Sequence, residues 1–348
     1  MIKYLGSKRT LIPRLLEVFG ALDPKPTCIA DLFSGTSRVG HACKKAGYQV
    51  ISNDHNAYAE TLARCYVQAD LETHRAEAGL RIEQLMALSP QAGYFTKTFC
   101  EESRFFTPKN GARVDAMRNQ IAAWEGAGLL TEELKAILLV SLMEAADRVD
   151  STTGLQMAYL KSWAPRAEKD MELRMPEVLS NGKHGTCTAT GIDALDAARA
   201  CADSADLVYL DPPYNQHKYL GNYHIWETLV RWDAPESYGV ARKRVDCRER
   251  SSDFNSKPRI ASALHEVISA CLAGQRVQHL VLSFNNEGYL QREDISAMLA
   301  PHGTLDVIEV DYKRYVGAQI GIHNPKGKRV GKPGKLRNTE FLFVLSRS

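Results

Sequence analysis

The chain has 348 residues, of which 44% are hydrophobic and 24% charged, which is typical of a globular protein. No apolar run approaches the ~18 residues needed to cross a bilayer, and the basic start MIKYLGSKRT lacks the apolar stretch of a signal peptide, so we expect a cytoplasmic protein that does not contact a membrane. The formal net charge of +3 does not by itself indicate a nucleic-acid partner, and the eight cysteines form no CxxC pair, which argues against disulfides and against a metal site.

The first predicted elements form the start of a βαβ unit. Residues 28–33 are a short apolar run that predicts a strand, and residues 38–46 have helical composition. Gly47 is placed to end that helix, and residues 48–54 form a second apolar run that closes on a carboxylate. Strand, helix and strand in this order predict an α/β fold.

The region from about 70 to 185 changes to a helical pattern. The predicted helices cover 71–88, 112–124 and 130–149. Few strand candidates occur there, so we predict an inserted, mostly helical domain at 70–185, with residues 1–69 and 186–348 forming one α/β domain.

The remaining elements return to alternating strands and helices. Strands are predicted at 185–191, 206–214 and 279–284, and helices at 259–274 and 291–299. Residues 304–315 and 339–345 suit a terminal antiparallel hairpin, which completes a mostly parallel sheet. Residues 236–258 and 318–338 read as long loops, and loops of that length are often functional.

A glycine-bearing turn joins the first strand to its helix. Asp31 ends the strand and Gly35 follows, where glycine lets the backbone approach a ligand and the helix N-terminus attracts negative charge. Such a turn holds a pyrophosphate or an amino-acid carboxylate, or it is only structural. Asp31 favours a ligand with an ammonium group, and Asp54, after the second strand, is placed to accept ribose hydroxyls, although an aspartate there is often a turn former.

The strongest motif is Asp211-Pro212-Pro213-Tyr214, which follows the apolar run LVYL. It is expected at the carboxyl end of a strand, where open α/β sheets bind ligands. The two prolines make a stiff turn. Asp211 and the Pro212 carbonyl suit the two hydrogens of an amino group, and Tyr214 suits stacking on the ring that carries it.

Two further segments have both a functional and a structural interpretation. Ser283-Phe284-Asn285-Asn286 ends a predicted strand and either lines a base pocket or forms a turn. Tyr219, Tyr223 and Trp226 have helical spacing, and we expect core packing rather than base contact.

Together these motifs resemble the S-adenosylmethionine-dependent DNA N6-adenine methyltransferases of the DPPY type, in which an amino-terminal cofactor motif and a DxFxG motif precede DPPY. Lys3-Tyr4-Leu5-Gly6-Ser7-Lys8 resembles the amino-terminal motif. The resemblance implies that Tyr4 lies near the cofactor adenine and Lys8 near its amino-acid end.

The resemblance also assigns the remaining cofactor residues. Asp31, Phe33 and Gly35 match the loop at the methionine end, and Asp54 matches the acid at the ribose. The other two assigned residues are Asp193, beside the cofactor adenine, and Asp211. The family often has a second glycine where this chain has Ser37, which puts the geometry of the loop in question.

The resemblance implies a Rossmann-like class I methyltransferase sheet that carries an inserted target-recognition domain. It implies methyl transfer from S-adenosylmethionine to N6 of a flipped adenine in double-stranded DNA, with Asp211, Pro212 and Tyr214 as catalytic residues and no metal. The resemblance leaves three biological roles open: a methyltransferase paired with a cognate restriction endonuclease, an orphan regulator and a phage enzyme.

Two basic segments are candidates for phosphate contacts. The first lies at 326–337 and contains Lys326, Lys328, Arg329, Lys332, Lys335 and Arg337 without one acid. The second lies at 242–250, where basic residues outnumber acidic ones. The alternative for either segment is a solvated surface loop.

The sequence leaves other functions open. The same motif serves transfer to N4 of cytosine, to RNA bases or to a protein glutamine. A dinucleotide-dependent oxidoreductase is disfavoured, because the chain lacks the GxGxxG spacing and because that function would not explain the DPPY motif. A DNA-binding relic without catalysis is disfavoured by the presence of Asp31, Asp211 and Tyr214.

Overall fold

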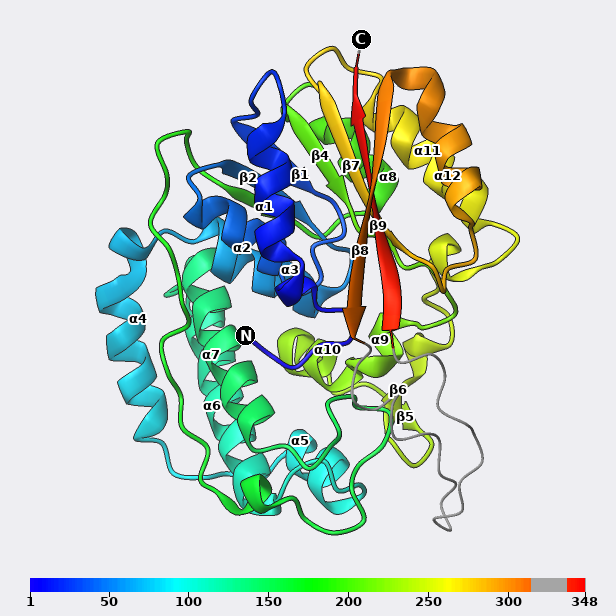
Figure 1. Cartoon of the computed structure of the whole chain (residues 1–348). Helices are drawn as coiled ribbons and strands as arrows, with labels where there is room; N and C mark the ends of the chain where they lie inside the picture. The colour runs from blue at the N-terminus through cyan, green and yellow to red at the C-terminus, as the bar shows by residue number, and fades with distance from the viewer. Residues whose placement is uncertain (314–336, 348) are drawn as a thin grey trace. The chain divides into compact units, whose positions relative to one another are not determined.

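The computed structural model describes residues 1–313 and 337–347, shown in Figure 1. The chain forms two compact units: Met1–Ala197 with Lys218–Ser251, and Ala198–His217 with Ser252–Ser348. We call them unit 1 and unit 2. Within the described residues no helix has the length and apolarity that a membrane span requires.

Unit 1 contains three parallel strands in the order β3-β2-β1. They are β1 (Cys28–Asp31), β2 (Gln49–Asn53) and β3 (Thr188–Thr190), with Ile29 opposite Val50 and Ser52 opposite Ala189. Helix α2 (Arg38–Lys45) connects β1 to β2, and Gly47 follows it with φ +93°, as the sequence predicted. All four β1 residues are buried, which explains why Cys28, Ile29 and Ala30 are apolar before the strand ends at Asp31.

The rest of unit 1 is mainly helical. The longer helices are α1 (Ile12–Ala21), α3 (Ala57–Ala63), α4 (Leu71–Met86), α6 (Pro108–Gly126), α7 (Glu132–Arg148) and α10 (His224–Arg231). The shorter elements are η1 (Lys8–Thr10), η2 (Arg64–Gln68), α5 (Tyr94–Thr96), η3 (Lys97–Glu101), η4 (Pro165–Glu168), α9 (Tyr219–Asn222), β5 (Ser237–Tyr238), β6 (Lys243–Arg244) and η5 (Val245–Cys247). The predicted helices at 71–88, 112–124 and 130–149 are confirmed, although α6 begins earlier, with a proline in its first turn.

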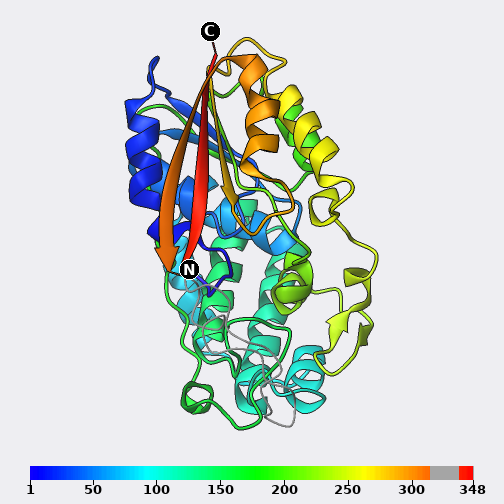
Figure 2. The same ribbon diagram turned by 45° about the vertical axis from the view of Figure 1, so that its right-hand side comes forward.

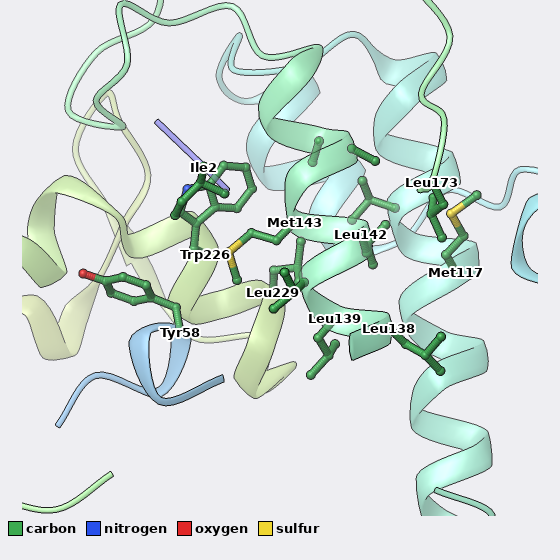
Figure 3. Packing of buried hydrophobic residues seen from close by; sticks show 14 of the residues in the cluster. Ile2, Tyr58, Met117, Leu138, Leu139, Leu142, Met143, Leu173, Trp226 and Leu229 are labelled. Carbon is green, nitrogen blue, oxygen red and sulfur yellow. The ribbon is translucent and has the colours of Figure 1, made fainter. Parts of the chain in front are cut away.

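Helix α7 contributes many residues to a hydrophobic core cluster in unit 1. It begins where the Thr131 hydroxyl accepts a hydrogen bond from the Leu134 N–H at 3.1 Å. Figure 3 shows Trp226 and Leu229 of α10 packed on one side of it and Met117 of α6 on the other. Because both sides are covered, every residue of α7 from 136 to 143 is buried, and the charged residues lie toward the two ends of the helix. Tyr223 and Trp226 are each 1% exposed, which confirms the predicted core packing for these two, and Tyr219 is half-buried against the same cluster.

Unit 2 contains four strands in the order β4-β7-β9-β8. Strands β4 (Leu207–Leu210) and β7 (His279–Asn285) are parallel, whereas β8 (Thr304–Lys313) and β9 (Arg337–Ser346) form the predicted antiparallel hairpin, visible as the long pair in Figure 2. The helical elements are α11 (Ile260–Cys271), α12 (Arg292–Leu299), η6 (Asp253–Asn255) and η7 (Ala300–His302), and α8 (Ala194–Cys201) spans the boundary of the units.

These strands and helices confirm the predicted α/β class with its terminal hairpin. The predicted loop at 236–258 contains the short β5–β6 pair and two 3-10 turns, and the predicted loop at 318–338 lies almost entirely outside the described residues. All eight cysteines are buried and free. The division into a catalytic domain and a target-recognition domain at 70–185 stays a prediction.

Candidate functional site

In unit 1, the turn after β1 is tied to the end of β2. The Ser34 N–H donates to the Asn53 carbonyl at 3.0 Å, and the Gly35 N–H donates to Asp54 Oδ2 at 3.1 Å. Asp54 Oδ1 accepts from the Asn56 N–H at 3.0 Å. Asp54 Oδ1 also accepts from Asn56 Nδ2 at 3.1 Å. A carboxylate has about four acceptor positions, so Asp54 keeps about one for a ribose hydroxyl while it holds the turn.

The turn has buried polar groups that suit a ligand. Asp31 is 1% exposed, and the hydroxyls of Ser34 and Ser37, like that of Ser7 in the amino-terminal motif, are buried without a hydrogen-bond partner among the described residues. A buried hydroxyl without a partner is costly, and a zwitterionic amino-acid group would satisfy several of them. These residues therefore fit the amino-acid end of S-adenosylmethionine. The described residues contain no cluster that could hold a metal ion.

Ser37, where the family that the sequence resembles often has glycine, adopts the backbone conformation that favours glycine. Its φ is +58° and its ψ +23°, in the left-handed region, directly before α2. Gly35 has φ +51°. The loop therefore forms its left-handed turn even with a serine, at a conformational cost to that residue.

We expect Ser37→Gly to raise the free energy of unfolding above that of Ser37→Ala by about 1 kcal/mol. Both changes remove the buried hydroxyl, so their difference isolates the backbone conformation. Urea unfolding of the two variants measures it, and equal stabilities would contradict the strain assigned to this position.

Asn53 was missed by sequence reasoning, although it is a polar residue at the end of an apolar strand. Its Oδ1 accepts from the Ile192 N–H at 3.1 Å, and its Nδ2 donates to the Ile192 carbonyl at 3.1 Å. The amide thus fixes the turn that precedes Asp193. Asp193 itself is exposed and accepts from the Leu195 N–H at 2.8 Å at the start of α8, so its role beside the cofactor stays a prediction.

The amino-terminal motif lies against the same turn. The Tyr4 ring is 3.4 Å from the position that a Cβ on Gly35 would take, and it stacks on Tyr223 with ring centroids 4.5 Å apart. This contact is with the loop assigned to the methionine end, and the placement of Tyr4 beside the cofactor adenine stays a prediction. Lys8 is half-buried at the start of η1, and Phe33 is half-buried after β1.

The end of α7 anchors this motif. The Lys3 N–H donates to Asp147 Oδ2 at 3.1 Å, and Lys3 Nζ donates to Asp150 Oδ1 at 2.8 Å. Arg166 also binds Asp150, at 2.7 Å. Burial raises the pKa of Asp147 to about 6, with Asp150 adding to the rise and Lys3 opposing it.

This raised pKa predicts a pH-dependent stability. Between the ordinary value of 3.8 and about 6, the folded state binds a proton at Asp147 that the unfolded state does not. The free energy of unfolding therefore falls as pH rises through that window, and the loss is complete above it. The difference in free energy of unfolding between Asp147→Asn and wild type should therefore shift in favour of the variant by roughly 1–3 kcal/mol from pH 4 to pH 7. Urea unfolding at the two pH values measures this shift.

Asp70→Asn is the matched control, because the Asn181 N–H holds the pKa of Asp70 below its usual value. That contribution to stability is present at neutral pH and is lost on acidification. The free energy of unfolding of Asp70→Asn should therefore fall relative to that of wild type as pH rises. The same pH trend in both variants would contradict the assignment at Asp147.

In unit 2, the DPPY segment begins directly after β4. Asp211 and Tyr214 are half-buried and Pro212 is buried. The Tyr289 N–H donates to the Tyr214 carbonyl at 2.9 Å, and the Tyr214 and Phe284 rings pack with centroids 5.8 Å apart at an angle of 59°. The Tyr214 ring is therefore held at the carboxyl end of a strand, as the sequence predicted.

The turn that holds Tyr214 is built on a buried polar pair. Asn285 and Glu340 face each other across β7 and β9, and Asn285 Nδ2 donates to Glu340 Oε2 at 3.3 Å. The Ser283 hydroxyl donates to the other carboxylate oxygen of Glu340, which is 3% exposed. Asn285 Oδ1 accepts from the Glu287 N–H at 2.8 Å, so Asn285 forms a turn, one of the two interpretations of this segment.

The basic segment at 242–250 is largely neutralised inside unit 1. Arg244 is 3% exposed and bidentate on Asp233 at 2.7 and 2.8 Å, with Asp246 at 3.0 Å. Arg250 pairs with buried Glu227 at 2.7 Å, and Arg242 pairs with Glu102. Arg244 is therefore a structural residue and is closed to a phosphate, contrary to the expectation for this segment.

The other basic segment, at 326–337, lies almost entirely outside the described residues. Five of its residues lie outside the described part of the chain, namely Lys326, Lys328, Arg329, Lys332 and Lys335, and the side chain of Arg337 also lies outside it. Their predicted contact with DNA phosphates stays a prediction.

Comparison with known proteins gives the family. Residues 4–290 match the D12 class N6 adenine-specific DNA methyltransferases. The chain is 31% identical over 360 residues to the type II methyltransferase M.NlaIII of Neisseria lactamica, covering 100% of both chains. It is 29% identical over 360 residues to the modification methylase StsI of Streptococcus sanguinis, covering 99% of this chain and 52% of that protein.

A third relative is the type II methyltransferase M.FokI of Planomicrobium okeanokoites, 29% identical over 332 residues, which cover 90% of this chain and 50% of that protein. The chain thus spans about half the length of the StsI and FokI proteins and the full length of M.NlaIII. The family match includes both the turn after β1 and the DPPY segment. The chain belongs to the D12 class N6 adenine-specific DNA methyltransferase family.

Proposed function

We propose that the chain transfers the methyl group of S-adenosylmethionine to N6 of an adenine flipped out of duplex DNA at a specific sequence. The observation that carries the proposal is the DPPY segment at the end of β4, where Tyr214 is fixed by Phe284 and Tyr289 in a chain of this family. The family favours adenine N6 over cytosine N4, RNA and protein as the acceptor.

The proposed cofactor residues lie in unit 1. Asp31 pairs with the ammonium group, the turn at Gly35 and the buried serine hydroxyls accommodate the amino-acid end, and Asp54 accepts the ribose hydroxyls. When bound, S-adenosylmethionine supplies an electrophilic methyl group on its sulfonium. Tyr4, Lys8, Phe33 and Asp193 are proposed to complete this site on the basis of the family resemblance.

The proposed acceptor residues lie in unit 2. The N6 lone pair of adenine is delocalised into the ring, so hydrogen bonds from N6 to Asp211 and to the Pro212 carbonyl favour a pyramidal, more reactive nitrogen. Tyr214 stacks on the base and offsets part of the few kcal/mol that flipping costs. Orientation of the amine supplies the rest of the acceleration without a covalent intermediate.

DNA from a methylation-deficient bacterial host that expresses the protein tests the proposal. Sequencing that detects N6-methyladenine should find it at one short recognition sequence and absent from the vector control. Modification of cytosine N4 instead, or of no base in DNA, would reject adenine as the substrate. The relatives named as type II methyltransferases support the further proposal that a restriction endonuclease of the same specificity is the cellular partner.

A further inference from the structure

The loop that carries Tyr214 needs support from elsewhere in unit 2. It runs from Asp211 to His217, between β4 and α9, and belongs to no helix or strand. Pro212 and Pro213 have no N–H, which removes two donors that could have fixed it to a neighbouring strand. Besides the packing of the Tyr214 ring on Phe284, groups that bind the carbonyls of this loop are therefore a means of fixing it.

One support is already part of the site. Tyr289 donates its N–H to the Tyr214 carbonyl at 2.9 Å and its hydroxyl to Gln216 Oε1 at 3.2 Å. These contacts hold the middle of the loop.

The second support comes from Asn255, in the region that the sequence marked as a long loop. Asn255 Nδ2 donates to the Asn215 carbonyl at 2.7 Å and to the His217 carbonyl at 3.1 Å. One carboxamide thus binds two carbonyls that lie on either side of Gln216. Within the loop, the His217 N–H donates to Asn215 Oδ1 at 3.0 Å, so the same short turn is closed from inside as well.

The backbone around Asn255 is itself held by hydrogen bonds. It is the last residue of η6, where the Ser252 hydroxyl accepts from the Phe254 N–H at 3.3 Å and the Phe254 side chain is 6% exposed. The backbone carbonyl of the next residue, Ser256, accepts from the Ile260 N–H at 2.9 Å at the start of α11. The carboxamide is therefore presented from a short turn anchored to a helix rather than from a free loop.

We propose that Asn255 is a positioning residue for methyl transfer, which holds the 211–217 loop so that the Tyr214 ring is ready to stack on the flipped base. The proposal rests on the proposed function, since it takes Tyr214 as the base platform. Asn255 acts through the loop and is not itself catalytic. Its loss frees two loop carbonyls and lets the ring move, and small misplacements of reacting groups cost up to about a hundredfold in rate.

Single-turnover methylation of a duplex that contains the enzyme's own target tests this role. Asn255→Ala should lower the rate of transfer by about ten- to a hundredfold and leave the Kd for S-adenosylmethionine, measured by calorimetry, within about twofold. Asp253→Asn is the matched control, because Asp253 lies in the same turn and its carboxylate pairs with half-exposed Arg259 at 3.0 Å. It should transfer at the wild-type rate.

Asn255→Asp supplies a readout that a merely structural role does not move. The ionised carboxylate has no proton to donate and repels both carbonyl oxygens, whereas the protonated acid donates one hydrogen bond. The rate of this variant relative to wild type should rise as pH falls, while the ratio for Asp253→Asn stays flat. Aspartate has nearly the same size as asparagine, so Asn255→Asp still tests the proposal if the Asn255→Ala protein does not fold.

The outcomes separate the two proposals when Tyr214→Ala is measured in parallel. If Tyr214→Ala is slow while both Asn255 variants transfer at the wild-type rate, or if the ratio for Asn255→Asp does not change with pH, the role of Asn255 is wrong and the proposed function stands. If Tyr214→Ala transfers at the wild-type rate, the base platform itself is wrong, and the positioning role falls with it.

Discussion

Asp211→Ala should lower methyl transfer by at least about a hundredfold, the scale of removing one group that stabilises a transition state. The carboxylate is expected to accept a hydrogen bond from N6 that strengthens as the nitrogen becomes pyramidal, so its loss affects turnover more than DNA binding. Asp211 is half-buried directly after β4, so the strand and its partner β7 should form without it. Tritium transfer from labelled S-adenosylmethionine to duplex DNA measures the effect.

The matched control lies at the other end of the same strand. Asp206 precedes β4 and pairs with half-exposed Arg276 at 3.0 Å, a surface contact that contributes little to stability. Asp206→Asn should therefore transfer at the wild-type rate. Native-rate methylation by Asp211→Ala would require the catalytic assignment to be abandoned, and an equal loss in Asp206→Asn would point to general damage to β4.

Tyr214→Ala should slow transfer by roughly ten- to a hundredfold, since stacking of a base on an aromatic ring contributes about 1–3 kcal/mol. Tyr214→Phe and Tyr214→Trp should retain most of the rate, because the proposed role needs a π-face and not a hydroxyl. The ring also packs on Phe284, a contact that both aromatic variants can keep.

Fluorescence of 2-aminopurine at the target position gives an independent measure of the same step. Its emission should rise when wild-type protein binds and the base leaves the stack, and the rise should be similar with Tyr214→Phe. If Tyr214→Phe proves as slow as Tyr214→Ala, the hydroxyl is the functional group, and base stacking is not the reason for this tyrosine.

Local pattern in the sequence was sufficient for the elements and for the two motifs. The apolar run at 28–33, the turn at Gly35 and the helix at 38–46 were predicted from neighbouring residues, and β1 and α2 lie there. The DPPY segment was predicted at a strand end because LVYL precedes it, and β4 ends at Leu210. These features depend on residues within a few positions of one another, where periodicity and glycine or proline signals act.

The tertiary structure decided which polar residues serve the fold and which are left for a ligand. Arg244 reads in the sequence as one cation of a basic run, yet Asp233 and Asp246 enclose it and remove it from any DNA contact. Asn255 reads as an ordinary loop residue, and only the fold brings its amide to the carbonyl of Asn215. The physical reason is the same for both residues. The role of a buried polar side chain depends on its hydrogen-bond partner, and a partner that is distant in the chain leaves no local pattern in the sequence.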